Sequence, residues 1–275
     1  MSKTKTKTKA VALAPTAEAL ELLKESFPTE AGYEKTLLPR LSMVSQDVTE
    51  GKGKLMKVVT EAGTFFKENQ TEELNEEGKP VWEKTELGTE IEATVIYSRK
   101  QLKYYNEATE LYTSSPVYDN DDEVLPLFCD KKEIDRGTVK ELQAKYPGTT
   151  LAGKPKSNLE VNRVLYVLYE GEVYQMNLRG SSMYSWLAYS RKVLPPAVLT
   201  RFSSEAQEKG SIAWNQLTCE TVRPLDADEI KDITAKVTEI KNSIAEEKQF
   251  FASRNAQETV VEYIKKEDEE DFGEF

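Results

Sequence analysis

Tyrosines alternate with lysines and arginines through the central part of this sequence. An aromatic ring can stack on a nucleobase and a basic side chain can neutralise a phosphate, so together they suit single-stranded nucleic acid. Each stacked base contributes roughly 1–3 kcal/mol to binding. The candidate binding residues are Tyr97, Arg99, Lys100, Lys103, Tyr104, Tyr105, Lys154, Lys156, Arg163, Tyr166, Tyr174, Arg179 and Arg201.

Each of these tyrosines also has an alternative role in packing, because aromatic residues are favoured in β-sheets. Taken singly, a tyrosine fits the core or the sheet surface better than a binding site, and so do Trp186 and Trp214. Only alternate residues of a strand share a face, so Tyr166 and Tyr169 cannot both lie on one binding surface. The prediction of binding therefore depends on the joint pattern, and the sequence leaves open which tyrosines are exposed.

The chain lacks the residues of most enzyme sites. It contains no histidine, which excludes imidazole-based zinc sites and Ser-His-Asp or Cys-His nucleophiles. Cys129 and Cys219 are too few for a disulfide framework or a CxxC metal site. The glycine-lysine runs at 51–54 and 153–157 lack P-loop spacing, and the acids at 119–123 fit a solvated loop better than a metal site. We expect no catalytic residues, no metal and no cofactor.

The net charge of −11 is distributed unevenly. Segments 67–92 and 262–275 carry net charges of −6 and −5, and the remainder is neutral. A basic groove would therefore require that the charges of the central part be sorted onto one face, which composition cannot show.

The elements that must position the candidate residues are mostly strands. Period-two alternation of apolar residues begins at Gly88, and two β-rich runs around a glycine-containing turn predict a hairpin. Residues 106–160 are rich in turn formers and predict a long excursion from the sheet. The expected strands are 54–59, 88–97, 102–105 after a turn, 163–169, 173–178, 197–202 and 211–222, and 67–86 is expected to be a linker or surface loop.

Helices are predicted at 136–146 and at 181–193, the second capped by Ser181 or Ser182. A longer helix begins at Asp226, which forms a pair resembling a capping box with Glu229. Its apolar residues recur at spacings of three and four, which is typical of an amphipathic helix that packs on a sheet. These residues are Ile230, Ile233, Val237, Ile240 and Ile244.

The end of the sequence is an acidic run that contains two phenylalanines: Asp268, Glu269, Glu270, Asp271, Phe272 and Phe275. It resembles the tails of bacterial and phage single-stranded DNA-binding proteins. The resemblance implies that the tail competes with DNA for the binding groove and recruits replication and repair proteins. This sequence lacks the proline that precedes the terminal phenylalanine in bacterial members, which leaves the identity of the partner open.

The order of elements from 88 to 222 resembles, more loosely, the oligonucleotide-binding (OB) fold, a five-stranded barrel with a helix between its third and fourth strands. The expected fold class is α+β, mainly β: an OB-like five-stranded barrel with long loop insertions, a C-terminal amphipathic helix and a disordered acidic tail. The expected parts are a flexible basic arm at 1–15, an N-terminal extension and acidic linker at 16–87, an OB-like nucleic-acid-binding core at 88–225, the helix at 226–261 and the tail at 262–275.

Together these features predict sequence-nonspecific single-stranded DNA binding in phage or bacterial replication, recombination or repair. The expected location is the cytoplasm, that of the host for a phage protein, with no membrane partner because no apolar run reaches ~20 residues. A virion structural or assembly protein without nucleic-acid binding is the main alternative, and a carboxylate- and Mg²⁺-dependent accessory enzyme is a second. The sequence is compatible with a homo-oligomer but does not determine the oligomeric state. It also leaves open the preference between DNA and RNA.

Overall fold

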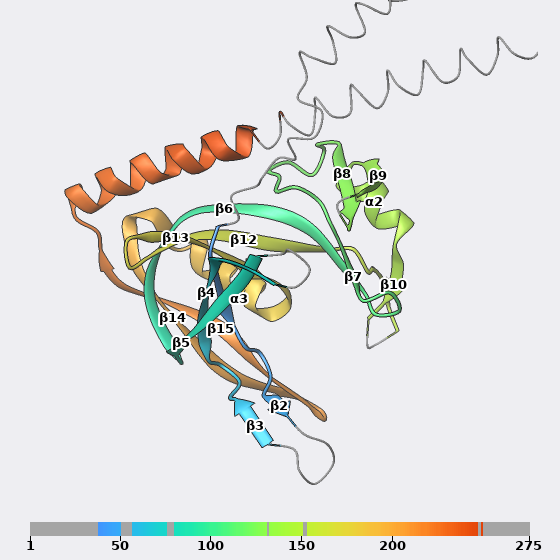
Figure 1. Ribbon diagram of the computed structural model, residues 1–275, viewed down its shortest axis with the longest axis horizontal. Helices are drawn as coiled ribbons and strands as arrows, with labels where there is room; N and C mark the ends of the chain where they lie inside the picture. Colours follow the sequence, from blue (N-terminus) through green and yellow to red (C-terminus); the bar gives the residue numbers. More distant parts are fainter. Residues whose placement is uncertain are drawn as a thin grey trace, which may run out of the picture. The chain divides into compact units, whose positions relative to one another are not determined.

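The computed structural model describes residues 38–50, 57–75, 80–130, 132–150, 153–246 and 249, and within them the protein is mainly β. Eleven strands form one large sheet (Figure 1). They are β1 (Arg40–Met43), β4 (Phe65–Leu74), β5 (Pro80–Gly88), β6 (Glu90–Asn106), β7 (Leu111–Ser114), β8 (Leu125–Cys129), β9 (Lys132–Gly137), β12 (Glu160–Tyr169), β13 (Glu172–Leu178), β14 (Val198–Lys209) and β15 (Ile212–Pro224). Two further hairpins pair β2 (Val48–Glu50) with β3 (Lys57–Thr60), and β10 (Pro147–Thr149) with β11 (Pro155–Ser157).

The long strand β6 organises the sheet, because its two halves pair with different neighbours. Its first residues pair antiparallel with β14, with Ile91 opposite Phe202. Its later residues pair with β12 on one side and β7 on the other. The strand is continuous, so the turn predicted before Leu102 is wrong, whereas the predicted hairpin of β12 and β13 is confirmed.

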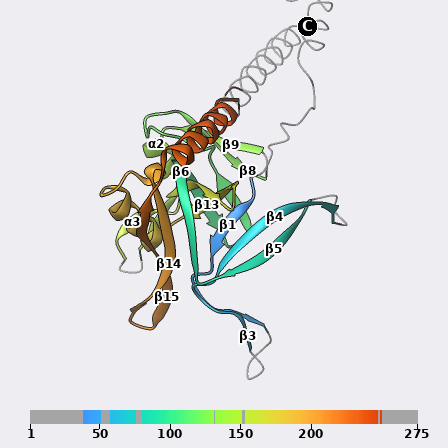
Figure 2. The same ribbon diagram turned by 90° about the vertical axis from the view of Figure 1, so that its left-hand side faces the viewer.

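The segment predicted as a charged linker at 67–86 largely forms strands. β4 and β5 pair antiparallel, and β4 also pairs with β1 (Figure 2). Phe65 at the start of β4 is fully buried, whereas most residues after Phe66 are polar. Because polar residues occupy both faces beyond Phe66, the period-two pattern that identifies a half-buried strand is missing from the sequence.

The sheet is not closed into a barrel, which corrects the expected five-stranded barrel. Among the strands that the structure describes, β15 pairs only with β14, and the free side of β13 is taken by β1 in parallel. One backbone hydrogen bond, from Asn215 N to Ser45 O at 2.7 Å, links β15 to the chain that follows β1. A strand from the expected N-terminal extension therefore belongs to the central sheet.

The predicted helix after the hairpin is confirmed as α3 (Gly180–Ser190), followed by the 3-10 turn η2 (Pro195–Ala197). Its N-cap is Arg179, which makes no side-chain capping bond. Ser181 Oγ instead accepts a hydrogen bond from Trp214 Nε1 at 3.1 Å, and Ser182 Oγ accepts one from Leu217 N at 3.0 Å. The two serines predicted to cap α3 therefore attach it to β15.

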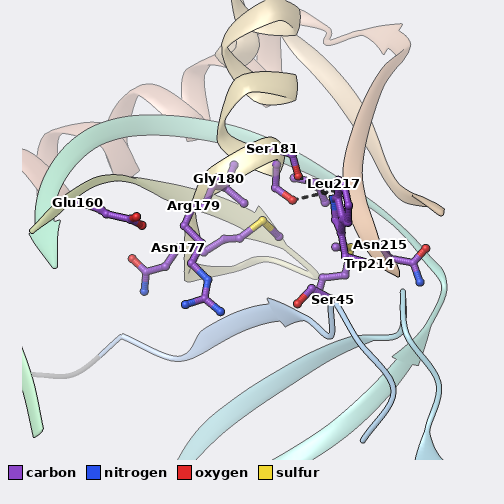
Figure 3. Close-up of a pocket in the computed structure, with 13 residues that line it drawn as sticks. Ser45, Glu160, Asn177, Arg179, Gly180, Ser181, Trp214, Asn215 and Leu217 are labelled. Carbon is purple, nitrogen blue, oxygen red and sulfur yellow. Dashed lines mark hydrogen bonds between the residues drawn. The ribbon is translucent and has the colours of Figure 1, made fainter. Parts of the chain in front are cut away.

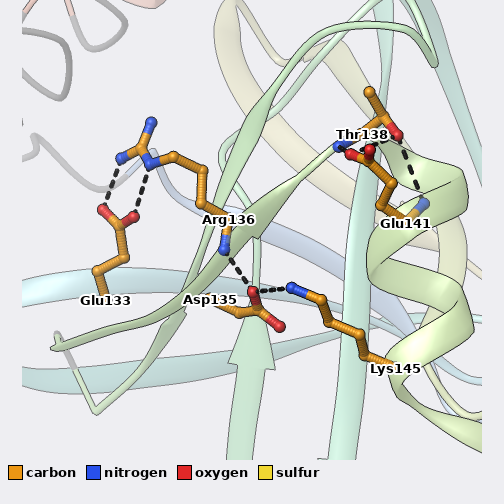
Figure 4. Close-up of polar contacts among 6 residues, drawn as sticks. All are labelled: Glu133, Asp135, Arg136, Thr138, Glu141 and Lys145. Carbon is orange, nitrogen blue, oxygen red and sulfur yellow. Dashed lines mark hydrogen bonds and ion pairs between the residues drawn. The ribbon is translucent and has the colours of Figure 1, made fainter.

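The excursion between β6 and β12 contains α2 (Val139–Lys145), close to the predicted 136–146. Thr138 and Glu141 form a capping box at its start, in which Glu141 Oε2 accepts from Thr138 N at 2.8 Å (Figure 4). At its end Lys145 forms an ion pair with Asp135 of β9, so both ends of α2 are fixed. Leu142 and Leu102 belong to one buried cluster, which attaches the excursion to β6.

The last described helix spans residues 227–246 and packs on the sheet as predicted. Ile233, Ile240 and Ile244 are buried in a cluster with Tyr166 and Val164 of β12, whereas Ile230 is exposed. The predicted capping box is confirmed. Glu229 N donates to Asp226 Oδ1, and Asp226 N donates to Glu229 Oε2, both at 2.9 Å. No helix within the described residues has the length and apolar character needed to cross a membrane.

Candidate nucleic-acid interface

The candidate binding residues of the central strands divide between the two faces of the sheet, because side chains alternate along a strand. One face carries Tyr97, Arg99, Lys103 and Tyr105 of β6 together with Tyr166, which pairs with Tyr97. We call it the outer face. The opposite face carries Lys100, Tyr104, Arg163 and Tyr174. The sequence placed all of them in one group, and only the register separates them.

Part of the outer face lies under the 227–246 helix, drawn in orange beside β6 in Figure 1. Tyr166 is 5% exposed, and its ring lies 5.9 Å from that of Tyr97, centroid to centroid. Lys241 of the helix lies over the Tyr97 ring at 5.7 Å, and Arg99 lies over it at 4.4 Å. These rings therefore pack against the helix and present little surface to a base.

Tyr174 lies in the main core and is 1% exposed. Its hydroxyl donates to Glu172 Oε2 at 3.0 Å, and burial is the main cause of its raised pKa. Tyr104 is half-buried, with its ring 5.9 Å from that of Tyr146 in an edge-on contact. For these tyrosines the structure favours the packing role over the binding role.

Several candidate cations have carboxylate partners. Arg99 pairs with Asp119, and Lys100 Nζ lies 2.7 Å from Asp121 Oδ1. Burial lowers the pKa of Arg99. Two further pairs lie nearer the surface, Arg201 with Glu92 and Lys156 with Glu160, each at 2.7 Å. Exposed pairs of this kind contribute at most about 1 kcal/mol, so a phosphate can replace the carboxylate at Arg201. Lys154 is exposed.

Two exposed tyrosines lie side by side next to the turn that joins β6 to β7. Tyr105 and Tyr112 pair across the strands, their ring centroids are 4.7 Å apart, and they are 42% and 62% exposed. Adjacent exposed rings form a surface on which bases can stack. Tyr112 is not among the candidate residues predicted from the sequence, because it lies in the segment at 106–160 that is rich in turn formers. Only the cross-strand register brings it to Tyr105.

A cleft of about 410 Å³ lies where β13 leads into α3, with β15 and the chain after β1 as its other walls (Figure 3). The cleft lies between β13 and β15, which do not pair with each other in the described sheet because β1 pairs with β13. Arg179 and Trp214 line opposite sides in Figure 3. Other lining residues are Met43, Met176, Asn177, Leu178, Ser181 and Leu217.

The described part of the chain holds no group of three or more histidines, cysteines, aspartates or glutamates placed to bind a metal ion. In the acidic run, Asp119 and Asp121 pair with Arg99 and Lys100, and Glu123 accepts backbone hydrogen bonds. Burial raises the pKa of the Cys219 thiol to about 12, so this cysteine is a poor nucleophile at neutral pH.

Comparisons with protein-family models, with curated proteins and with solved structures give no match to this chain. The basic arm at 1–15, residues 16–37, 51–56 and 76–79 of the expected extension, residues 250–261 of the expected C-terminal helix and the whole tail at 262–275 lie outside the described residues.

Proposed function

We propose that the protein binds single-stranded DNA without sequence preference, through an OB-like module made of β6, β12, β13, α3, β14 and β15. The observation that carries the proposal is the pairing of these elements. The first strand, β6, pairs with both the second and the fourth, β12 and β14, and α3 lies between the third and fourth strands. That is the strand and helix order of an OB fold. Here β1 takes the place beside β13 that a closed barrel gives to its fifth strand.

The surface at the ends of β12 and β13 supports the same function. OB folds bind oligonucleotides on their second and third strands and on the loops after the first and fourth strands. In this chain those loops are the excursion at 107–159 and the turn at 210–211. The cleft at Arg179 lies at the end of β13, beside the start of β12 and the start of β15. The Tyr105–Tyr112 pair joins the end of β6 to the first strand of the excursion, β7.

The mechanism follows from charge. Lysines and arginines release counterions from the phosphates, so affinity falls as salt rises. Stacking on tyrosines tolerates any base, because each base has a π-face. In this proposal the acidic tail competes for the same cations and recruits replication, recombination or repair proteins once DNA has displaced it.

The test is a titration with fluorescein-labelled oligo(dT), followed by anisotropy at increasing salt. We expect the logarithm of the binding constant to fall linearly with the logarithm of the salt concentration. Tyr112→Ala should weaken it by about 1–3 kcal/mol, the contribution of one stacked base. Tyr184→Ala is the matched control, because Tyr184 is 67% exposed but lies on α3. Absence of binding by the folded full-length protein would reject the proposal and favour the virion-assembly alternative.

A further inference from the structure

The cleft at the end of β13 combines an apolar interior with a polar rim. Met176, Leu178 and Leu217 are each 5% exposed or less and form part of its lining. At about 410 Å³ it lies within the size range of small-molecule pockets, roughly 300–1,000 Å³. It is therefore large enough for one nucleotide and too small for a folded partner.

Trp214 forms a fixed wall of this cleft (Figure 3). Its indole nitrogen donates to Ser181 Oγ at 3.1 Å, which orients the ring. The neighbouring Asn215 N donates to Ser45 O at 2.7 Å, and Leu217 N donates to Ser182 Oγ at 3.0 Å. Both α3 and the chain after β1 thus hold this part of β15, so a ligand would meet an aromatic face that is already in place.

Arg179 supplies a positive charge at the rim. Its side chain is exposed, and among the described residues no carboxylate pairs with it. Glu160 also lines the cleft, but Lys156 Nζ lies 2.7 Å from its carboxylate and neutralises it. An arginine guanidinium matches the geometry of a phosphate with two parallel hydrogen bonds. The rim therefore favours an anion, whereas the interior favours a flat, weakly polar group.

We propose that the cleft is a nucleotide subsite that holds one unit of a bound DNA strand, with its base against Trp214 and its phosphate at Arg179. This subsite rests on the proposed function, since a strand must be bound for one unit to enter. Nucleotides carry both required parts, an aromatic ring and an adjacent phosphate. The subsite differs from the Tyr105–Tyr112 pair, which offers stacking on an open surface.

The chain contains three tryptophans, Trp82, Trp186 and Trp214, which permits a direct spectroscopic test. Oligo(dT) should quench the tryptophan fluorescence of the full-length protein. Trp214→Phe keeps an aromatic ring, so it should still bind labelled oligo(dT) by anisotropy while losing most of the quenching. Trp82→Phe is the control and should keep the quenching, because Trp82 lies on β5 under Arg40. Equal quenching in the Trp214→Phe variant would overturn the subsite.

Affinity provides a second readout that does not depend on Trp214. Arg179→Ala should lower the slope of log affinity against log salt by about 0.7, the value for one phosphate contact on a single strand. Arg191→Ala is the matched control, because Arg191 is an exposed arginine at the other end of α3. An unchanged slope for Arg179→Ala, with normal binding by the unaltered protein, would reject the subsite and leave the proposed function standing.

Two further outcomes distinguish a failure of the proposed function from a cleft that binds a free nucleotide. Failure of the unaltered protein to bind oligo(dT) would reject the proposed function and the subsite together. Competition by deoxythymidine monophosphate at concentrations similar to those of oligo(dT) would assign the cleft to a free nucleotide and overturn its role in strand binding. Much weaker competition is expected, since a single nucleotide lacks the remaining contacts of the strand.

Discussion

At the scale of single residues, the tyrosines differ in how deeply their rings are buried. Tyr174 is 1% exposed and Tyr112 is 62% exposed, although both lie on strands. A buried ring stabilises the fold, whereas an exposed ring is available to a ligand. The two positions should therefore respond to substitution in opposite ways.

Tyr174→Ala should lower the free energy of unfolding by about 3–5 kcal/mol, because it removes a large core side chain. Tyr174→Phe keeps the ring and loses the hydrogen bonds of the hydroxyl with Glu172 and Asn69, so its effect should be about 1–2 kcal/mol. Denaturant unfolding measures both. A loss of DNA affinity in Tyr174→Phe with unchanged stability would contradict the core assignment.

Gly63 has a backbone requirement that no other residue meets easily. Its φ is +92°, and a Cβ there would lie 2.2 Å from Ser204 Oγ of β14. Gly63→Ala should destabilise the protein by more than about 1 kcal/mol. Gly171→Ala provides the control, because Gly171 has a similar φ of +85° with nothing near its Cβ position. Equal melting temperatures in the two variants would show that the contact with Ser204 has no effect.

At the scale of elements, the start of the 227–246 helix depends on one ionised group. Glu229 accepts from Arg223 Nη1 and Nη2 at 2.8 and 2.7 Å and from Asp226 N at 2.9 Å. These contacts lower the pKa of Glu229 from its ordinary 4.5 to about 2. A lowered carboxyl pKa stabilises the folded state above the ordinary value and loses that effect as the pH falls.

The stability of this helix should therefore decrease between about pH 4.5 and pH 2. Glu229→Gln keeps the capping geometry but removes the charge, so it should flatten the pH dependence in this window. Hydrogen exchange of the helix amides measures the effect. Glu239→Gln, at an exposed position of the same helix, should retain the dependence of the unaltered protein.

The contact between this helix and the sheet should depend on its buried isoleucines. Ile240 is 7% exposed and Ile230 is 42% exposed. Ile240→Ala should reduce stability by about 2–5 kcal/mol, whereas Ile230→Ala should have a much smaller effect. Differential scanning fluorimetry compares them. Similar melting temperatures would mean that the helix contributes little through its apolar face.

At the scale of the whole molecule, the acidic segments oppose the proposed binding of an anion. The tail residues 267–275 contain six carboxylate side chains in a chain whose net charge is −11. Deleting them should tighten oligo(dT) binding, because their competition for cations is removed, and should abolish the recruitment of partner proteins. A tail of equal length with glutamine and asparagine in place of the acids should bind DNA like the deletion. Unchanged affinity in both variants would remove the competition mechanism.

The sequence by itself determined the features that depend on neighbouring residues. The β12–β13 hairpin, α2, α3 and the capping box at Asp226 follow from turn residues, apolar periodicity and side chains three positions apart. These signals are local, so no knowledge of the fold is needed to read them.

Only the tertiary structure decided which segments meet. The sequence did not place Arg40–Met43 beside β13, and it did not predict β4 and β5, because polar residues occupy both of their faces. It did not separate the buried Tyr166 and Tyr174 from the exposed Tyr105, and it did not indicate Tyr112. Trp214 lines the same cleft as Arg179 only because β15 packs on α3. Strand pairing and burial depend on contacts between residues far apart in the chain, and the same local pattern is compatible with several of them.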